Sequence, residues 1–326
     1  MARVVLGMAV PHSGMLGKAP EVWLEDGLRD HENKMLWFRN QHWKYEDLVE
    51  ARKDHGIKAF LTLEERQSRH ARTAKALEEL RRVYQAHKPD VAIIIGTDQK
   101  EIFIDTSPSL AIYTGTDLPN GPPQRAVFAP DHSVTHKAAP DLALHLITSL
   151  QRGGFDMTEV IKWPVNVWMK PPTQVVPHAF GFIYRQIMQD DPVPNVPIMM
   201  NVFYPPNQPT FNRAMQIGQA LVDAVKAWDS DTKVALIASG GMSHFVCDEE
   251  IDQVFLECFR NYDFDRLSKI DERTYQAGTS EVKLYVPVLL AMSQLGCKTN
   301  IVDYVPCYRT EAGTGEGFGF MYWTPP

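Results

Sequence analysis

Cysteine is scarce in this chain, which has only four in 326 residues, and no two of them have Cys-x-x-Cys spacing. A disulfide framework or a zinc-thiolate site would need more cysteines or closer spacing. We therefore expect the cysteines to be reduced and mostly packed in the interior. They are Cys247, Cys258, Cys297 and Cys307.

An excess of positive charge is also absent, because 33 Lys and Arg face 40 Asp and Glu, for a net charge of −7. Proteins that follow a phosphate backbone or an anionic membrane carry basic blocks, and this chain has none. No apolar run approaches the roughly 20 residues needed to span a bilayer, and the chain does not open like a secretory signal. We expect no nucleic acid or membrane partner and a cytoplasmic location.

Internal repeats, low-complexity tracts and a clear linker are missing as well. Instead, apolar segments of strand length alternate with amphipathic segments along the whole chain, which is typical of α/β proteins. We predict strands at 3–10, 91–96, 110–113, 156–163, 196–203, 234–238 and 319–323, helices at 63–87, 141–151, 212–228, 282–294 and after Asp248, and a loop at 114–130. The pattern predicts one α/β domain over 1–326, with a mostly parallel or mixed central sheet flanked by helices and a helical excursion at 20–88.

The segment KVALIASGGMSH, residues 233–244, combines a buried-strand pattern with a turn and a histidine. Gly240 and Gly241 allow a sharp turn, so His244 is predicted in a strand-to-helix loop at the carboxyl edge of the sheet, where α/β proteins bind ligands. A histidine there can move protons near neutral pH. The alternative is a loop histidine that only bonds a carbonyl group.

Other polar residues are predicted at the same edge. His12 follows the first strand, and the run Thr97-Asp98-Gln99-Lys100-Glu101 follows the strand at 91–96. Glu281 falls in the first turn of the helix at 282–294, where a carboxylate is favoured by the helix dipole and could be a simple capping acid. We predict that His12 and Glu281 converge on one site.

In these residues the chain resembles the class III extradiol ring-cleavage dioxygenases of the protocatechuate 4,5-dioxygenase catalytic-subunit type. The resemblance covers nearly the full length, and its most specific parts are the Gly-Gly-Met-Ser-His segment, the His12 loop and the order of the histidines, with His178 among them. The segments PPNQP and YRTEAGTG are similar to those of the subgroup that acts on methoxylated or biphenyl lignin-derived catechols.

The resemblance implies an enzyme that opens the ring of a carboxylated aromatic diol with O2, using a non-haem Fe(II) held by two histidines and a glutamate. It puts His12 and Glu281 in two of these ligand positions. At the second histidine position this chain has Gln99. A neutral amide oxygen is a weaker iron ligand than imidazole. The affinity for iron should therefore fall unless His55, His70 or Asp98 supplies a substitute ligand.

The resemblance also implies roles for residues around the iron. His244 is expected to be the general base and later acid, and His178 to support catalysis or contact the substrate. Arg309 and Lys170 are candidates for binding the substrate carboxylate, and Ser243 is a candidate substrate contact.

Two alternatives stay open: a metal-dependent hydrolase or lyase of the same fold, which Gln99 favours, and a non-catalytic binding homologue. Because relatives form dimers and the stretch from Trp23 to Trp43 is rich in aromatic residues, we also expect a homodimer or higher homo-oligomer.

Overall fold

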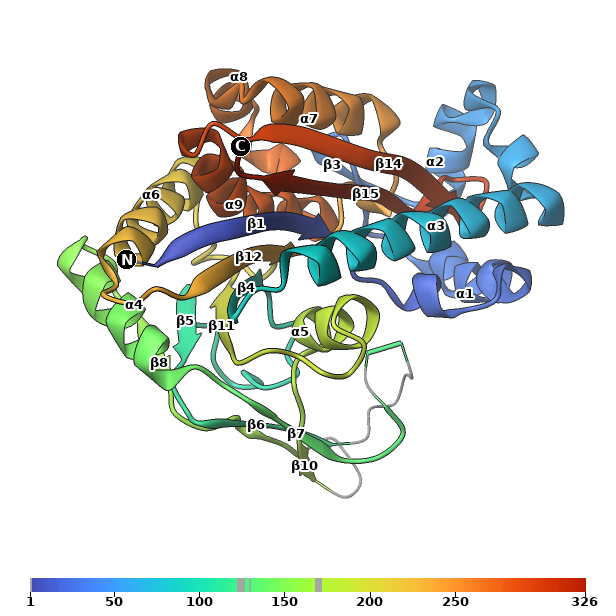
Figure 1. Cartoon of the computed structure of the whole chain (residues 1–326). Coiled ribbons are helices and arrows are strands. Elements are labelled where there is room, and N and C mark those ends of the chain that lie inside the picture. The colour runs from blue at the N-terminus through green and yellow to red at the C-terminus, as the bar shows by residue number, and fades with distance from the viewer. Residues whose placement is uncertain (1, 122–126, 129, 168–171) are drawn as a thin grey trace.

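The computed structural model describes residues 2–121, 127, 128, 130–167 and 172–326. Within them the centre of the molecule is a mixed sheet of nine strands (Figure 1). Eight strands follow the order β13-β15-β1-β12-β4-β11-β5-β8, and β14 pairs with β15. Their bounds are β1 Arg3–Val10, β4 Val91–Gly96, β5 Leu110–Tyr113, β8 Thr158–Val160, β11 Asn195–Met200, β12 Lys233–Ser239, β13 His244–Val246, β14 Lys298–Tyr308 and β15 Thr314–Thr324.

The four strands β1, β12, β4 and β11 are mutually parallel and form the middle of the sheet. Both β4 and β11 are buried along their whole length. Their continuous apolar sequences suit burial on both faces, which parallel strands require. The predicted α/β class with a mixed sheet is therefore confirmed, and the parallel strands end together at one edge.

Helices cover both faces of the sheet, as Figure 1 shows. One layer contains α4 Pro140–Arg152, α6 Phe211–Ala227, α7 Glu249–Asn261, α8 Phe264–Lys269 and α9 Val282–Gln294, and the other contains α3 Leu63–His87 and α5 His178–Phe182. Along β4 the side chains alternate between the layers: Ile93 and Ile95 join the core under α6, whereas Ala92 and Ile94 join the core under α3. No helix in the described ranges combines the length and apolar character needed to cross a membrane.

The N-terminal excursion is more varied than predicted. Besides short 3-10 turns it contains α1 Trp23–Gly27, a hairpin of β2 Leu36–Phe38 and β3 Gln41–Trp43, and α2 Tyr45–Ala51, before the long helix α3 begins. Trp23 is fully buried against α3, which explains why this segment is so apolar.

Three further features of the structure differ from what the sequence analysis predicted. The strand β14 was not predicted, because its sequence mixes polar and apolar residues without a clear strand pattern, and its pairing with β15 makes it a strand. The predicted loop at 114–130 contains β6 Asp117–Asn120, which pairs with β7 Val134–Lys137, and a second small hairpin joins β9 Val165–Asn166 to β10 Thr173–Gln174. His244 begins the short strand β13 instead of lying in a loop. The four cysteines are free and buried, as predicted.

Candidate active site

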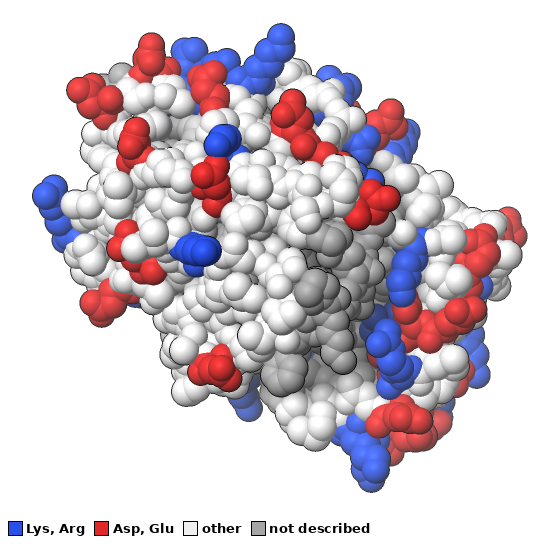
Figure 2. Space-filling model, turned by 90° about the horizontal axis from the view of Figure 1, so that it is seen from below, with Lys and Arg blue, Asp and Glu red and all other residues white. Residues whose placement is uncertain are grey.

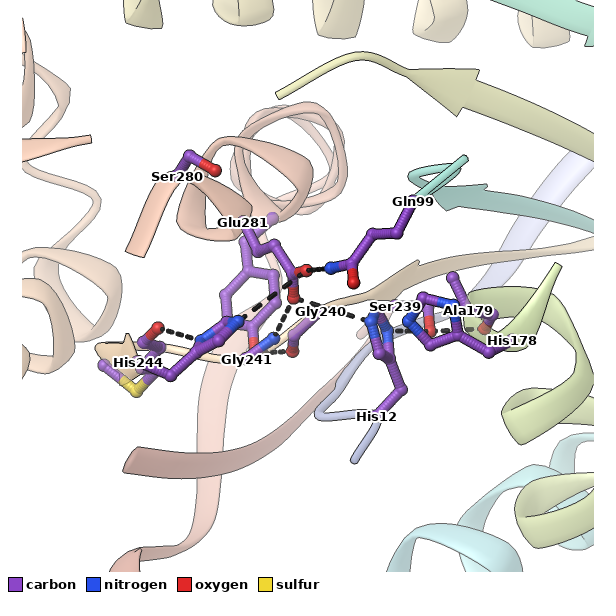
Figure 3. Close-up of polar contacts among 12 residues, drawn as sticks. His12, Gln99, His178, Ala179, Ser239, Gly240, Gly241, His244, Ser280 and Glu281 are labelled. Atoms are coloured by element: carbon purple, nitrogen blue, oxygen red, sulfur yellow. Dashed lines mark hydrogen bonds and ion pairs between the residues drawn. The ribbon is translucent and has the colours of Figure 1, made fainter. Parts of the chain in front are cut away.

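A cavity of about 510 Å³ opens at the edge where the parallel strands end. His12 follows β1, Gln99 follows β4, and His244 comes after the turn that follows β12. Because β1, β12 and β4 are neighbours in the sheet, these residues lie close together in space. Glu281 enters from the turn before α9, and all four line the cavity (Figure 3).

Glu281 is the centre of this group and is fully buried. Its Oε2 accepts a hydrogen bond from the backbone N–H of Gly241 at 2.8 Å, and its Oε1 accepts one from the amide of Gln99 at 3.2 Å. A side-chain carbon at position 240 would lie 3.0 Å from the Cβ of Glu281, so Gly240 makes room for the carboxylate. Burial alone raises the pKa of Glu281, but His12 and His244 outweigh it and hold that pKa well below its usual range.

The hydrogen bonds of His12 fix which of its ring nitrogens faces Glu281. The hydroxyl of Ser239 donates to the carbonyl of Ala179 at 2.6 Å, so its oxygen must accept from Nδ1–H of His12, 3.0 Å away. The neutral imidazole then presents an unprotonated Nε2 to Glu281 Oε2, at 3.6 Å. Burial lowers the pKa of His12, and Glu281 offsets this only in part, so the neutral form is favoured.

His244 approaches the other carboxylate oxygen in a similar way. Its Nδ1 donates to the carbonyl of Met242 at 2.9 Å, and its Nε2 lies 3.8 Å from Glu281 Oε1. Burial lowers the pKa of His244, but the charges of Glu281 and Glu316 outweigh burial and raise it to about 9. Both imidazoles therefore face one carboxylate across a gap longer than a hydrogen bond.

The donor atoms around this gap fit a divalent metal ion. Two lone pairs that face each other at 3.6 Å, as on His12 and Glu281, favour a cation between them. Ligand atoms about 2.1 Å from one metal lie roughly 3.0 to 3.6 Å apart, which matches this distance and the 3.2 Å between Gln99 and Glu281. Turning the Gln99 amide over would present its oxygen to a cation placed in this gap.

Gln99 lines the cavity, and none of the suggested substitutes does. Asp98 accepts hydrogen bonds from the backbone N–H groups of residues 101–103 and stabilises its own loop. His70 lies on α3 beside Trp23, and His55 lies in a short turn; neither lines the cavity. Accordingly, no cluster of three or more His, Cys, Asp or Glu in the described ranges is arranged to hold a metal.

His178 lies beside His12, with the ring centroids 4.6 Å apart and the rings edge to face. Glu101 accepts a hydrogen bond from the backbone N–H of His178 at 3.0 Å and also contacts its Nδ1 at 2.7 Å. Burial lowers the pKa of His178, but the charge of Glu101 outweighs it and raises that pKa. The sequence analysis noted Glu101 only as part of a polar run, and its position after a buried strand was the available signal.

The predicted substrate contacts lie in different surroundings. Ser243 is fully buried, away from the cavity, and donates to Asp252 at 2.6 Å. Arg309 does line the cavity, but its guanidinium is paired with Asp30 at 3.0 Å. Lys170 lies outside the described residues.

Basic side chains gather at one wall of the cavity together with acidic ones. Lys18, Arg29 and Arg309 all line this wall, and Asp26 pairs with Lys18 at 2.5 Å and with Arg29 at 3.7 Å. Figure 2 shows Lys, Arg, Asp and Glu side chains mixed along one side of the hollowed face. The side chain of Arg29 is 77% exposed, so this guanidinium is accessible to a ligand.

Comparison with known proteins agrees with this arrangement. Residues 59–319 match the family described as the catalytic LigB subunit of aromatic ring-opening dioxygenase, and the match includes Gln99, His178, His244 and Glu281 but not His12. A segment of 144 residues is 31% identical to gallate dioxygenase from Pseudomonas putida and covers 41% of this chain. The chain spans only 38% of that relative. Since the family match covers most of the chain, the protein belongs to the family of catalytic LigB subunits of aromatic ring-opening dioxygenases.

Proposed function

We propose that this protein is an Fe(II)-dependent extradiol dioxygenase that opens the ring of a carboxylated catechol with O2. The observation that carries the proposal is the unprotonated Nε2 of His12 facing the ionised Glu281 at 3.6 Å within a cavity. The family match and the relative that is a gallate dioxygenase support ring opening. His12, Gln99 and Glu281 are the proposed ligands. Iron bound there supplies the redox chemistry that lets an aromatic diol react with O2.

His244 is the proposed proton acceptor for the substrate hydroxyl. Its Nδ1 is engaged with the Met242 carbonyl, so only Nε2 is available on the side of Glu281. Since the charge on Glu281 helps to raise the pKa of His244, neutralising that carboxylate by metal binding favours the neutral imidazole. The neutral imidazole can then take the hydroxyl proton and return it later in the reaction.

Other residues of the cavity suit the rest of such a substrate. Phe128, Val175, Val176 and Phe245 supply apolar surface against which an aromatic ring can pack. At the charged wall, Arg29 is the proposed partner for the carboxylate, because its side chain is exposed and its contact with Asp26 is long, at 3.7 Å. Arg309, by contrast, is held by Asp30 at 3.0 Å. The contact was first expected from Arg309 or Lys170, and Lys170 lies outside the described residues.

Replacing Gln99 by histidine should increase the affinity for Fe(II) by about 10-fold or more, because imidazole is a better iron ligand than an amide oxygen. The affinity is measured by competition with a chelator and by the iron content of the purified protein. Gln99→Ala, which removes the donor, is the matched control and should bind iron more weakly than the unmodified protein. Equal affinity in all three proteins would contradict the assignment of Gln99 as a ligand.

Metal analysis combined with an oxygen-uptake assay on a panel of catechols tests the function as a whole. The proposal requires both iron and consumption of O2 in proportion to ring opening. A hydrolase or lyase, which the amide ligand Gln99 favours as the second candidate, would turn over its substrate without O2. A non-catalytic homologue would bind aromatic diols and leave them unchanged.

We also propose that the protein is a homodimer or a higher homo-oligomer. In the N-terminal excursion, Leu28 and Met35 are 64% and 61% exposed, which leaves apolar surface uncovered in a single chain. Light scattering at micromolar concentration should give at least twice the single-chain mass of 37.0 kDa. A mass near 37.0 kDa would contradict the proposal.

A further inference from the structure

Glu316 is a buried carboxylate in the cavity to which nothing above gives a role. It belongs to β15 and lies directly opposite His244 in the pairing of β13 with β15. The residue is only 6% exposed, yet it lines the same cavity as His12 and Glu281. The sheet itself therefore positions Glu316 beside the proposed catalytic histidine.

One oxygen of this carboxylate has no partner. Oε1 of Glu316 is buried and has no hydrogen-bond partner within the described part of the chain. Burying an unpaired polar atom is costly, so a carboxylate that carries one and lines a cavity indicates a missing hydrogen-bond donor. Ser13 stabilises the ionised form of the carboxyl by hydrogen bonding, but this leaves Oε1 unpaired.

The other carboxylates that line the cavity are matched by protein groups. Asp26 pairs with Lys18, Glu101 with His178, and Glu281 with the groups described above. Arg309, which acts on Glu316 only weakly, forms its ion pair with Asp30. Glu316 is thus a negative group still able to accept a hydrogen bond.

The neighbouring backbone is shaped around this side chain. A side-chain carbon at position 241 would overlap Oε1 of Glu316, so glycine at this position lets the carboxylate lie against the turn. The same carbon would also lie 3.0 Å from Nδ1 of His244. Gly241 therefore holds open the space shared by the imidazole and the carboxylate.

We propose that Glu316 is a specificity-determining residue that accepts a hydrogen bond from a hydroxyl or amino substituent next to the diol on the substrate ring. The inference rests on the proposed function, which directs the diol toward Glu281. Nε2 of His244 lies 3.8 Å from Glu281, and the pairing of β13 with β15 sets Glu316 opposite His244. A ring that presents its diol at Glu281 and His244 directs the adjacent ring position toward Glu316.

A matched pair of ligands tests this proposal: 3,4,5-trihydroxybenzoate, which carries the extra donor, and 3,4-dihydroxy-5-methylbenzoate, which has a methyl group in its place. Both keep the carboxylate that the proposed function requires. Dissociation constants are measured without O2 by calorimetry, and kcat/KM is measured with O2. Burial raises the pKa of Glu316 to about 7, so both are measured at pH 8.5, where the carboxyl is ionised. For each protein, the values for the two ligands are compared as a ratio. Differences in iron loading between the proteins cancel in this ratio.

The unmodified protein should prefer the trihydroxy compound by about 10-fold or more, as expected for a hydrogen bond to a charged acceptor. Glu316→Gln should reduce this preference to about 3-fold or less, and Glu316→Met, which lacks any comparable acceptor, should abolish it. Glu250→Gln changes an exposed carboxylate outside the cavity and should leave the preference unchanged.

If both Glu316 variants kept the preference for the trihydroxy compound, the inference about Glu316 would be overturned, while the proposed function would stand. Glu316→Gln tests it even if the methionine variant does not fold, because glutamine keeps the shape of the side chain. Failure of the unmodified protein to bind either diol would overturn the proposed function, and this inference with it.

Discussion

Replacing His244 by alanine is expected to lower kcat by about 10²- to 10⁴-fold, the usual effect of losing a positioned proton-transfer group. The iron content should be unchanged, because His244 is not one of the proposed ligands. The substitution removes the hydrogen bond to the Met242 carbonyl, which should lower the free energy of unfolding by only about 1 kcal/mol. Oxygen uptake, iron analysis and denaturant unfolding measure these three quantities.

The matched control is His70→Ala, which removes a histidine on α3 away from the cavity and should leave kcat unchanged. If His244→Ala instead lost its iron, the residue would be a ligand, and its 3.8 Å approach to Glu281 would reflect coordination. Near-normal turnover with iron retained would reduce His244 to a structural residue.

Replacing His12 by alanine should abolish iron binding and activity together. Its Nε2 is the imidazole nitrogen proposed to bind the metal, so we expect the affinity for Fe(II) to fall by more than about 100-fold. Chelator competition and iron analysis measure the loss, and activity should not return at saturating substrate.

Ser239→Ala provides the matched comparison for His12. It keeps the imidazole but removes the hydroxyl that orients it, so the affinity should fall by about 10-fold only. If His12→Ala retained iron as well as the unmodified protein does, the proposed metal site would have to be abandoned.

The central sheet could be predicted because its strands carry a local signal. The apolar runs at 91–96 and 234–238 are buried on both faces, and burial of such runs is what a parallel sheet requires. From this placement alone, His12 and His244 could be expected at one edge. The convergence of His12 with Glu281 follows from the same geometry, whereas their chemical roles remain predictions.

Other features depend on contacts between distant segments and leave little trace in the local sequence. The strand β14 is specified by its pairing with β15. Glu316 could not be linked to His244 from the sequence, because only the pairing of β13 with β15 sets the two residues opposite each other. Ser243 was a natural candidate as the neighbour of His244. The bend before β13 directs Ser243 toward Asp252 of α7, whereas His244, the first residue of β13, faces the cavity.

The pairing of β1 with β15 also sets the order of events when the protein is made. Glu316 is synthesised 304 residues after His12 (316 − 12), a delay on the order of tens of seconds at about 5–20 residues per second. During that time β1 lacks its antiparallel neighbour and the cavity lacks one wall. A nascent chain arrested before residue 314 would therefore carry all three proposed ligands, His12, Gln99 and Glu281, and still have no closed site.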